Sequence, residues 1–151
     1  MNNSSIPPEE ERMERFFQLC RDHNLKVTHQ RLEIYKTFLR TTNHPTAEEL
    51  YNRLKKRLPT ISLDTIYRTL ALFEEHGLIT RVHGLSDKFR FDPNTELHHH
   101  FICTKCKRIY DFYWNEFDQL ILPESVKQFG EVHEEKVELR GICRDCLKQA
   151  E

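Results

Sequence analysis

The 151-residue sequence has no apolar run near the roughly 20 residues that a bilayer-spanning helix needs, and no signal-like apolar segment opens it. Internal repeats and low-complexity segments are also absent. We therefore expect a soluble, cytoplasmic protein without a membrane partner, in a reducing compartment where thiolates can hold metal. The length suits one domain or two small ones, and we expect two.

A recognisable hydrolytic metal motif, such as His-Glu-x-x-His, is missing as well. Hydrolysis by a bound metal needs an open coordination position and a general base. A zinc-dependent enzyme is therefore the less favoured class of protein, and we expect no enzymatic activity.

Four of the five cysteines form two Cys-x-x-Cys pairs, Cys103/Cys106 and Cys143/Cys146, with 36 residues between the pairs. Zinc favours four sulfur ligands in a tetrahedron, and one tight turn presents two of them. Disulfides or a redox motif are the alternative, but a Cys-x-x-Cys bridge is strained. We predict a closed structural Zn²⁺ site, which stabilises the fold without performing chemistry. The fifth cysteine, Cys20, is expected to be a buried small apolar residue.

The formal net charge of -1 hides an uneven distribution along the chain. Residues 24–91 carry 12 Lys/Arg against 7 Asp/Glu, whereas residues 92–151 carry 8 against 12. A basic half joined to an acidic half that is rich in metal ligands suggests a polyanion-binding module with a sensing or assembly module. Ordinary surface charge is the alternative.

Capping signals and helical periodicity predict four helices in the first half of the chain, beginning after Pro8, Thr28, Thr46 and Ser62, the last ending near Gly77. Residues 78–82 and 88–91 have strand character around a short hairpin at 83–87. This order predicts a winged helix-turn-helix domain over residues 1–91, with a disordered polar start at 1–8. A small helical bundle with no nucleic-acid role is the alternative.

The second half of the chain, residues 92–151, has a different pattern. Strands are expected at 101–103, 109–112 and 131–142, with a helix at 115–128. The first and last strands each run into a cysteine pair, so zinc would hold the end of this α/β unit to its start. The predicted fold class is thus α+β, a winged helix-turn-helix domain followed by a small α/β domain with a four-cysteine zinc.

The run His98-His99-His100 lies just before the first cysteine pair. Alternate residues of a strand share a face, so His98 and His100 are expected to point together while His99 points away. With Asp92 and Asp111 nearby, the set of nitrogen and oxygen ligands suits Fe²⁺, Mn²⁺ or Zn²⁺, which indicates a second, exchangeable metal. A solvated polar loop or a chance histidine run is the alternative.

Five motifs in order resemble the ferric uptake regulator family of bacterial metal-dependent repressors. They are Lys26-Val27-Thr28 with Gln30-Arg31, His44-Pro45-Thr46-Ala47-Glu48-Glu49-Leu50-Tyr51, Thr65-Ile66-Tyr67-Arg68-Thr69-Leu70, His98-His99-His100-Phe101-Ile102-Cys103-x-x-Cys106 and Gly141-Ile142-Cys143-x-x-Cys146. The resemblance covers nearly the whole chain. It implies a homodimer whose acidic half, residues 92–151, forms the dimer interface and whose basic half binds a double-stranded DNA operator.

The resemblance also implies a regulatory Fe²⁺ or Mn²⁺ at the hinge between the two domains, with ligands that correspond to His44, Asp92, His98, His100 and Asp111. A metal that binds the closed form best would shift the population toward it. Closing both subunits would set the recognition helices about one DNA turn (~34 Å) apart, as paired half-sites require. A further site of some members corresponds to Leu97, His99, Asp118 and Glu135. Leu97 cannot ligate, so at most His99, Asp118 and Glu135 would hold a weakly bound ion.

Tyr67 and Arg68 occur early in the fourth predicted helix, where a recognition helix approaches base edges. Arg68 could bond a guanine, and Tyr67 a thymine methyl group or a phosphate. The resemblance implies that Lys26 enters the minor groove and that phosphates are met by the remaining basic and hydroxyl groups. The full set of expected DNA contacts is Lys26, Thr28, Arg31, Thr65, Tyr67, Arg68, Arg81 and Lys88, with Arg90 in the wing.

The signal that the protein senses is open among peroxide, iron and zinc. Peroxide sensors of the family resemble this chain in having Asp at the positions of Asp92 and Asp111, where iron sensors commonly have Glu. Fe²⁺ can reduce peroxide and oxidise a nearby imidazole, and the resemblance implies His44 and His98 as the oxidised residues. Arg68, in contrast, is more typical of iron-type recognition helices. We expect a peroxide- and iron-responsive repressor, with plain iron sensing or zinc sensing as the alternatives.

Overall fold

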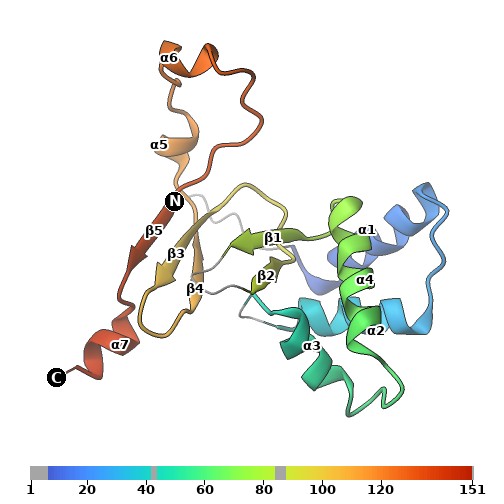
Figure 1. Ribbon diagram of the computed structural model, residues 1–151. Coiled ribbons are helices and arrows are strands. Elements are labelled where there is room, and N and C mark those ends of the chain that lie inside the picture. The colour runs from blue at the N-terminus through green and yellow to red at the C-terminus, as the bar shows by residue number, and fades with distance from the viewer. Residues whose placement is uncertain (1–6, 42–43, 84–87, 151) are drawn as a thin grey trace. The chain divides into compact units, whose positions relative to one another are not determined.

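The computed structural model describes residues 7–41, 44–83 and 88–150, which divide into two compact units between Thr95 and Glu96 (Figure 1). The expected disorder at 1–8 falls largely on residues 1–6, and most of the expected hairpin turn falls on 84–87, both outside the described residues. Within the described ranges, no helix is long and apolar enough to span a bilayer.

The N-terminal unit contains four helices and a two-stranded sheet. The elements are α1 (Glu9–Asp22), α2 (His29–Leu39), α3 (Ala47–Leu54), α4 (Leu63–Glu75), β1 (Thr80–His83) and β2 (Phe89–Asp92), with β1 and β2 antiparallel. The predicted caps are present: the side chains of Thr28, Thr46 and Ser62 accept the backbone N–H of the residue three positions on. Gly77 has a φ of 76°, which an L-residue rarely adopts, and α4 ends just before it.

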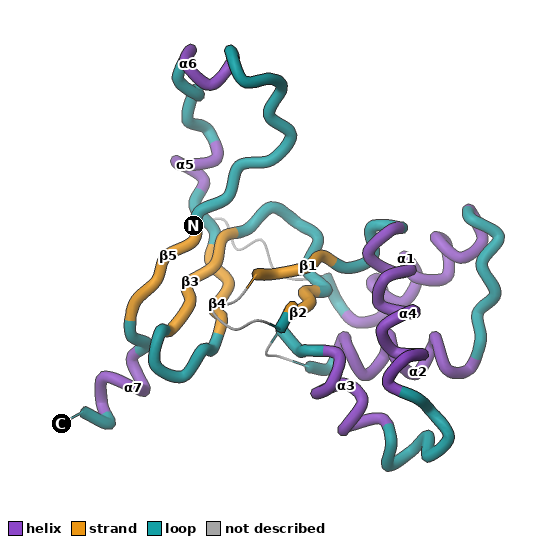
Figure 2. The backbone as a smooth tube through the Cα atoms, in the orientation of Figure 1, coloured by secondary structure: helices purple, strands orange, loops and turns teal. Residues whose placement is uncertain are grey.

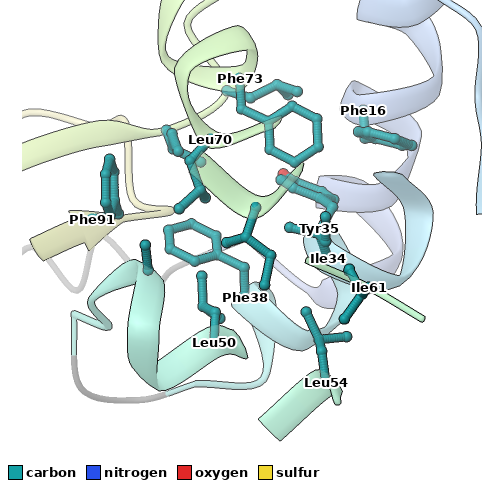
Figure 3. Packing of buried hydrophobic residues seen from close by; sticks show 14 of the residues in the cluster. Phe16, Ile34, Tyr35, Phe38, Leu50, Leu54, Ile61, Leu70, Phe73 and Phe91 are labelled. Carbon is teal, nitrogen blue, oxygen red and sulfur yellow. The ribbon is translucent and has the colours of Figure 1, made fainter. Parts of the chain in front are cut away.

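The core of the N-terminal unit is aromatic at its centre (Figure 3). The ring of Phe16 stacks on Tyr35 with centroids 4.8 Å apart, and the edge of Phe73 meets both rings. Around them lie fully buried aliphatic residues of α2, α3 and α4, among them Ile34, Leu50 and Leu70. Cys20 is buried in the same core, as expected. Each helix thereby buries one apolar face. The opposite, polar face at the start of α4 stays on the surface.

The C-terminal unit is built on a three-stranded sheet in the order β4-β3-β5 (Figure 2). Its strands are β3 (His99–Cys103), β4 (Ile109–Phe112) and β5 (Glu138–Gly141), and its helices are α5 (Asn115–Asp118), α6 (Glu124–Lys127) and α7 (Arg144–Lys148). β3 is antiparallel to β4 and parallel to β5. β5 passes close to the ring of Phe101 at Gly141. A Cβ at this position would lie only 3.2 Å from the ring, so glycine fits the close approach.

Two predicted elements of the C-terminal unit are shorter in the structure. The helix expected at 115–128 is two four-residue helices, because Pro123 has no N–H to donate and disfavours helical backbone at the residue before it. The strand expected at 131–142 is confined to β5. Its pairing stops at Val137, whose N–H donates to Nδ1 of His99 at 3.0 Å instead of to a strand carbonyl.

Candidate metal centres and nucleic-acid interface

The four cysteines singled out by their spacing lie together in the C-terminal unit. Cys103 Sγ is 3.9 Å from Cys146 Sγ, and Cys106 Sγ is 3.8 Å from Cys143 Sγ. All four are free thiols, within 4.8 Å of one another. Adjacent sulfurs of a tetrahedral zinc site with Zn–S bonds of about 2.3 Å lie about 3.8 Å apart. The separations therefore fit a closed Zn²⁺ site.

The backbone around the cluster stabilises thiolate. Cys103 Sγ accepts the N–H groups of Cys106 and Cys143 at 3.4 and 3.3 Å, and these bonds lower the pKa of Cys103 to about 6. The neighbouring Cys143 side chain and burial raise the pKa of Cys146 to about 12. Thiolates this close repel one another, so all four ionise together only when a cation neutralises them. The donor set thus fits a divalent ion and not four independent thiols.

Sequence reasoning missed an outer ring of polar groups at this cluster. The backbone N–H of Cys146 and the hydroxyl of Tyr110 donate to Cys143 and lower the pKa of its thiol. Arg108 Nη1 lies 3.3 Å from both Tyr110 Oη and Asp145 Oδ2. The guanidinium therefore connects the turn of the first cysteine pair to the helix of the second. The register Phe101–Tyr110 on neighbouring strands is the feature that brings Tyr110 to the cluster.

A second group of candidate ligands lies at the other end of β3. Asp111 Oδ1 is 3.6 Å from Nε2 of His98 and 3.3 Å from Nε2 of His100, because His100 stands opposite Asp111 in the β3–β4 register. His98 donates its Nδ1–H to the carbonyl of Glu96 at 2.6 Å, which leaves the lone pair on Nε2. A carbonyl on the second ring nitrogen is usual for metal-ligating histidines. These three side chains therefore suit a divalent cation.

The N-terminal unit contributes a pair of its own, His44 and Asp92. Phe91 donates its N–H to the carbonyl of Pro45 at 3.0 Å, which ties the end of β2 to the segment that precedes the cap of α3. His44 Nε2 then lies 3.1 Å from Asp92 Oδ2, with both side chains buried. Asp92 Oδ1 accepts the N–H of Asn94 at 2.8 Å. The carboxylate is held in place on both oxygens.

His99 points away from His98 and His100, as expected. Its Nδ1 accepts the N–H of Val137, so its Nε2 carries the proton and donates to Asp118 Oδ1 at 2.8 Å. Both ring nitrogens are used by this arrangement. Within the described part of the chain, no hydrogen bond or ion pair joins Glu135 to His99 or Asp118. An ion bound there would have to replace the proton on Nε2.

The expected reading surface begins at the first turns of α4. The Ser62 cap places Tyr67 and Arg68 on the exposed face while Ile66 and Leu70 enter the core. Arg68 Nε lies 3.0 Å from Asp64 Oδ2, and both side chains are largely in solvent. Thr65 uses its backbone N–H for the Ser62 cap, and its hydroxyl lies 2.8 Å from that of Ser62. The start of α4 is thus rigid and presents long polar side chains.

The other expected DNA contacts lie around α2 and the wing. Arg31 donates from Nη1 to the carbonyl of Lys26 at 2.9 Å and from its backbone to Thr28, which fixes the entry to α2. In the wing, Arg81 lies 2.9 Å from Glu74 and stacks 4.4 Å over the ring of Phe89. Arg90, on β2, donates to the carbonyl of His44 at 3.0 Å.

A carboxylate that the sequence had indicated only as part of a family motif lies among these groups. Glu48 Oε1 accepts the hydroxyl of Tyr67 at 2.8 Å and lies 3.7 Å from Nζ of Lys88. The hydrogen bond with Tyr67 lowers the pKa of Glu48, and the same bond raises the pKa of Tyr67. The contact joins α3, α4 and the start of β2.

Comparison with known proteins accounts for this combination of features. The sequence model of the "Ferric uptake regulator family" matches residues 22–140, about four fifths of the chain. The chain belongs to the ferric uptake regulator family. Members named "Peroxide-responsive repressor PerR" are 34% identical to it over 130 residues in Staphylococcus epidermidis, covering 85% of this chain and 86% of the relative, and 33% identical over 138 residues in Staphylococcus saprophyticus, covering 91% and 93%.

Solved structures of the family share the fold. The ferric uptake regulator Fur of Helicobacter pylori superposes with a TM-score of 0.73, covering 93% of this chain and 95% of that one, at 22% identity. The peroxide stress regulator of Campylobacter jejuni has a TM-score of 0.64 at 33% identity, covering 86% and 98%. The α+β fold class, with a winged helix-turn-helix and a four-cysteine cluster that suits structural zinc, is confirmed.

Proposed function

We propose that this family member is a homodimeric, metal-dependent transcriptional repressor of the bacterial cytoplasm, and that it responds to peroxide. Its N-terminal unit, expected at residues 1–91, would bind a DNA operator with paired half-sites, and its C-terminal unit, expected at 92–151, would dimerise and sense metal. The observation that carries the sensing role is the convergence of His98, His100 and Asp111 on one end of the β3–β4 pair. The name of the staphylococcal relatives, peroxide-responsive repressor, agrees with the signal.

One regulatory ion would use the ligands of both units. The C-terminal unit would supply His98, His100 and Asp111, and the N-terminal unit would supply His44 and Asp92, which already lie 3.1 Å apart. Only a conformation that offers all five ligands would bind the ion fully, so metal would favour that conformation and the DNA affinity that depends on it. Nitrogen and carboxylate ligands suit Fe²⁺ or Mn²⁺.

Dimerisation is supported by the exposed apolar surface of the C-terminal unit. Large side chains that lie in solvent in this single chain include Leu120, Ile121, Phe129, Leu139, Ile142 and Leu147. Ile121 is 95% exposed and Phe129 is 83% exposed, values that a monomeric surface rarely shows for neighbouring segments. β5 is an edge of the sheet, and its free backbone edge could pair with a second copy. We propose that this surface is the dimer interface.

The choice of signal rests on the two carboxylates, Asp92 and Asp111, and on the metal that they would hold. Bound Fe²⁺ would supply the electrons that reduce peroxide, which Mn²⁺ does not readily do. The resemblance to peroxide sensors of the family implies that His44 and His98 would be the imidazoles that gain an oxygen atom from peroxide. Both belong to the proposed ligand set, with Nε2 3.1 Å from Asp92 Oδ2 for His44 and 3.6 Å from Asp111 Oδ1 for His98. An oxidised imidazole is a poorer ligand, so the ion and then the DNA would be released. Plain iron sensing is the second candidate, because Arg68 is typical of iron-type recognition helices.

The decisive experiment compares Fe²⁺-loaded and Mn²⁺-loaded protein, prepared without oxygen, before and after mild peroxide. Metal analysis gives the bound ions, fluorescence anisotropy gives affinity for an operator selected from random DNA, and mass spectrometry gives the oxidation of each tryptic peptide. We expect the iron form to gain one oxygen on the peptide of His44 or His98 and to lose operator binding. The manganese form should keep both histidines unmodified and stay bound.

Other results would favour the competing functions. Unchanged operator affinity of the iron form after peroxide, or oxidised cysteines with intact histidines, would leave iron sensing as the better account. Operator binding that needs only a second equivalent of Zn²⁺ would indicate zinc sensing. If the protein bound no duplex at any salt concentration with any of these ions, the repressor function itself would be contradicted.

A further inference from the structure

A pocket of about 350 Å³ in the N-terminal unit separates the expected recognition helix from the wing. Its polar lining consists of Tyr67 from α4, Lys88 and Arg81 from the wing, and Glu48 from α3, over an apolar floor that includes Phe91. Three of these four polar side chains are among the expected DNA contacts. The fourth, Glu48, is an anion.

Glu48 is bonded the way an anionic ligand of this pocket would be. Its Oε1 accepts a phenol hydroxyl at 2.8 Å and lies 3.7 Å from an ammonium group, contacts that are also made to phosphate oxygens. The carboxylate is one third exposed, so the group is accessible from solvent. Ionised Glu48 is favoured here, since the Tyr67 hydroxyl lowers its pKa.

The cations of the pocket differ in how firmly they are held. Arg81 is fixed by Glu74 at 2.9 Å and by the ring of Phe89. Lys88, by contrast, keeps 63% of its side chain exposed and is bound to Glu48 at a distance beyond a direct hydrogen bond. A phosphate that displaced Glu48 would therefore take over its contacts with Lys88 and Tyr67 while Arg81 stayed in place.

We propose that this pocket is a phosphate site for the backbone of bound DNA and that Glu48 fills it in the DNA-free protein as an internal competitor. The proposal rests on the DNA-binding function proposed above and adds a residue to it. DNA binding would exchange the Glu48 contacts of Tyr67 and Lys88 for phosphate contacts. On any sequence, loss of the Glu48 contacts would offset most of the free energy of the new phosphate contacts, so Glu48 would weaken non-specific binding. Sequence reading would remain with the exposed residues at the start of α4.

The test measures binding of Mn²⁺-loaded full-length protein to a random-sequence duplex over a salt series. Glu48→Gln introduces a neutral group that can still bond Tyr67, but it removes the carboxylate charge that pairs with Lys88. We expect it to bind random DNA about two- to fivefold more tightly, the size of one exposed ion pair. Its log–log salt slope should steepen by about 0.9, the value for one phosphate contact, because the Lys88–phosphate contact would no longer be offset by the displaced Glu48 charge.

The matched control is Glu75→Gln, which removes the same charge from an exposed position near the end of α4. It should leave the slope unchanged and shift affinity less. In a Lys88→Ala background, Glu48→Gln should no longer steepen the slope, because the released cation is missing. Equal effects of Glu48→Gln and Glu75→Gln would show that only overall charge matters and would overturn the phosphate site.

The experiment distinguishes failure of the proposed phosphate site from failure of the proposed DNA-binding function. Wild-type protein that binds no duplex at low salt would contradict DNA binding as a whole, and the inference with it. Wild-type protein that binds, alongside a Glu48→Gln variant with unchanged or weaker affinity, would contradict the competitor role alone. Weaker binding would mean that Glu48 is needed to position Tyr67.

Discussion

Arg68 is held by a contact that DNA can replace at little cost. Its ion pair with Asp64 joins two side chains that are 81% and 69% exposed, and such pairs contribute little to stability. The helix beneath is fixed by the Ser62 cap and by Ile66 in the core. The backbone of the reading residue is thus rigid, whereas its guanidinium is free to turn toward a base edge.

We expect Arg68→Ala to lose roughly 1–3 kcal/mol of binding to the selected operator while keeping most of its affinity for random DNA, because a base contact specifies sequence. Lys88→Ala should weaken binding to both DNAs by similar factors, as the loss of a phosphate contact does. Anisotropy titrations at one salt concentration measure all four affinities. Equal losses of Arg68→Ala on both DNAs would remove this residue from base reading.

At the scale of elements, the capping box of α3 connects local structure to the candidate metal site. Thr46 accepts the N–H of Glu49 at 3.2 Å, and the Glu49 carboxylate accepts the N–H of Thr46 at 3.1 Å. His44 lies two residues before this cap, and the carbonyl of the intervening Pro45 pairs with Phe91. The position of His44 beside Asp92 therefore depends on where α3 begins.

Thr46→Ala should lower the free energy of unfolding of the N-terminal unit by about 1 kcal/mol, the usual cost of a lost side-chain cap. Urea denaturation followed by circular dichroism measures it. Thr60→Ala, in an exposed turn, is the matched control and should change stability by much less. A Thr46→Ala variant as stable as the Thr60→Ala variant would show that tertiary packing alone positions α3.

These elements also show what the sequence could and could not predict. Thr28, Thr46 and Ser62 act over three residues, so their caps were predictable and are confirmed. The residue at which β5 begins was not predictable, since it depends on His99 accepting the N–H of Val137 from 38 residues away. The proximity of the four cysteines followed from spacing, but the approach of Tyr110 and Arg108 to them follows from strand register. The Glu48–Tyr67 contact likewise joins two helices and has no local signal.

At the scale of the whole molecule, the chain separates a basic, helical unit from an acidic unit that holds ten of the candidate metal ligands: the four cysteines, His98, His99, His100, Asp111, Asp118 and Glu135. The larger core belongs to the N-terminal unit. Among the described residues of the C-terminal unit, the buried cluster around Cys103, Cys143 and Cys146 has Phe101 and Tyr110 packed against it, and Ile102 and Ile109 are also buried. A core of this size stabilises a unit poorly without a metal. We therefore expect zinc to be needed for the C-terminal unit to fold.

Cys143→Ser should lose the structural zinc and convert the dimer to an unstable monomer, because the closed thiolate site contributes folding free energy directly. Metal analysis and analytical ultracentrifugation measure the two effects. Cys20→Ser is the matched control, since Cys20 is buried in the N-terminal core and should affect neither zinc content nor assembly. A Cys143→Ser protein that kept its zinc and stayed a stable dimer would contradict the structural role of the site.

The parallel pairing of β3 with β5 also bears on the order in which the protein folds. His100 and Glu138 come together only after the residues between them have closed into a long loop. The chain loses the entropy of that closure before pairing of the two strands can contribute any stability. The helices of the N-terminal unit need no such closure. A zinc ion that captured Cys103 and Cys143, at adjacent ends of the two strands, would close the loop first and fix the register for β5. We therefore expect zinc supply, and not chain collapse, to determine when the C-terminal unit reaches its native state.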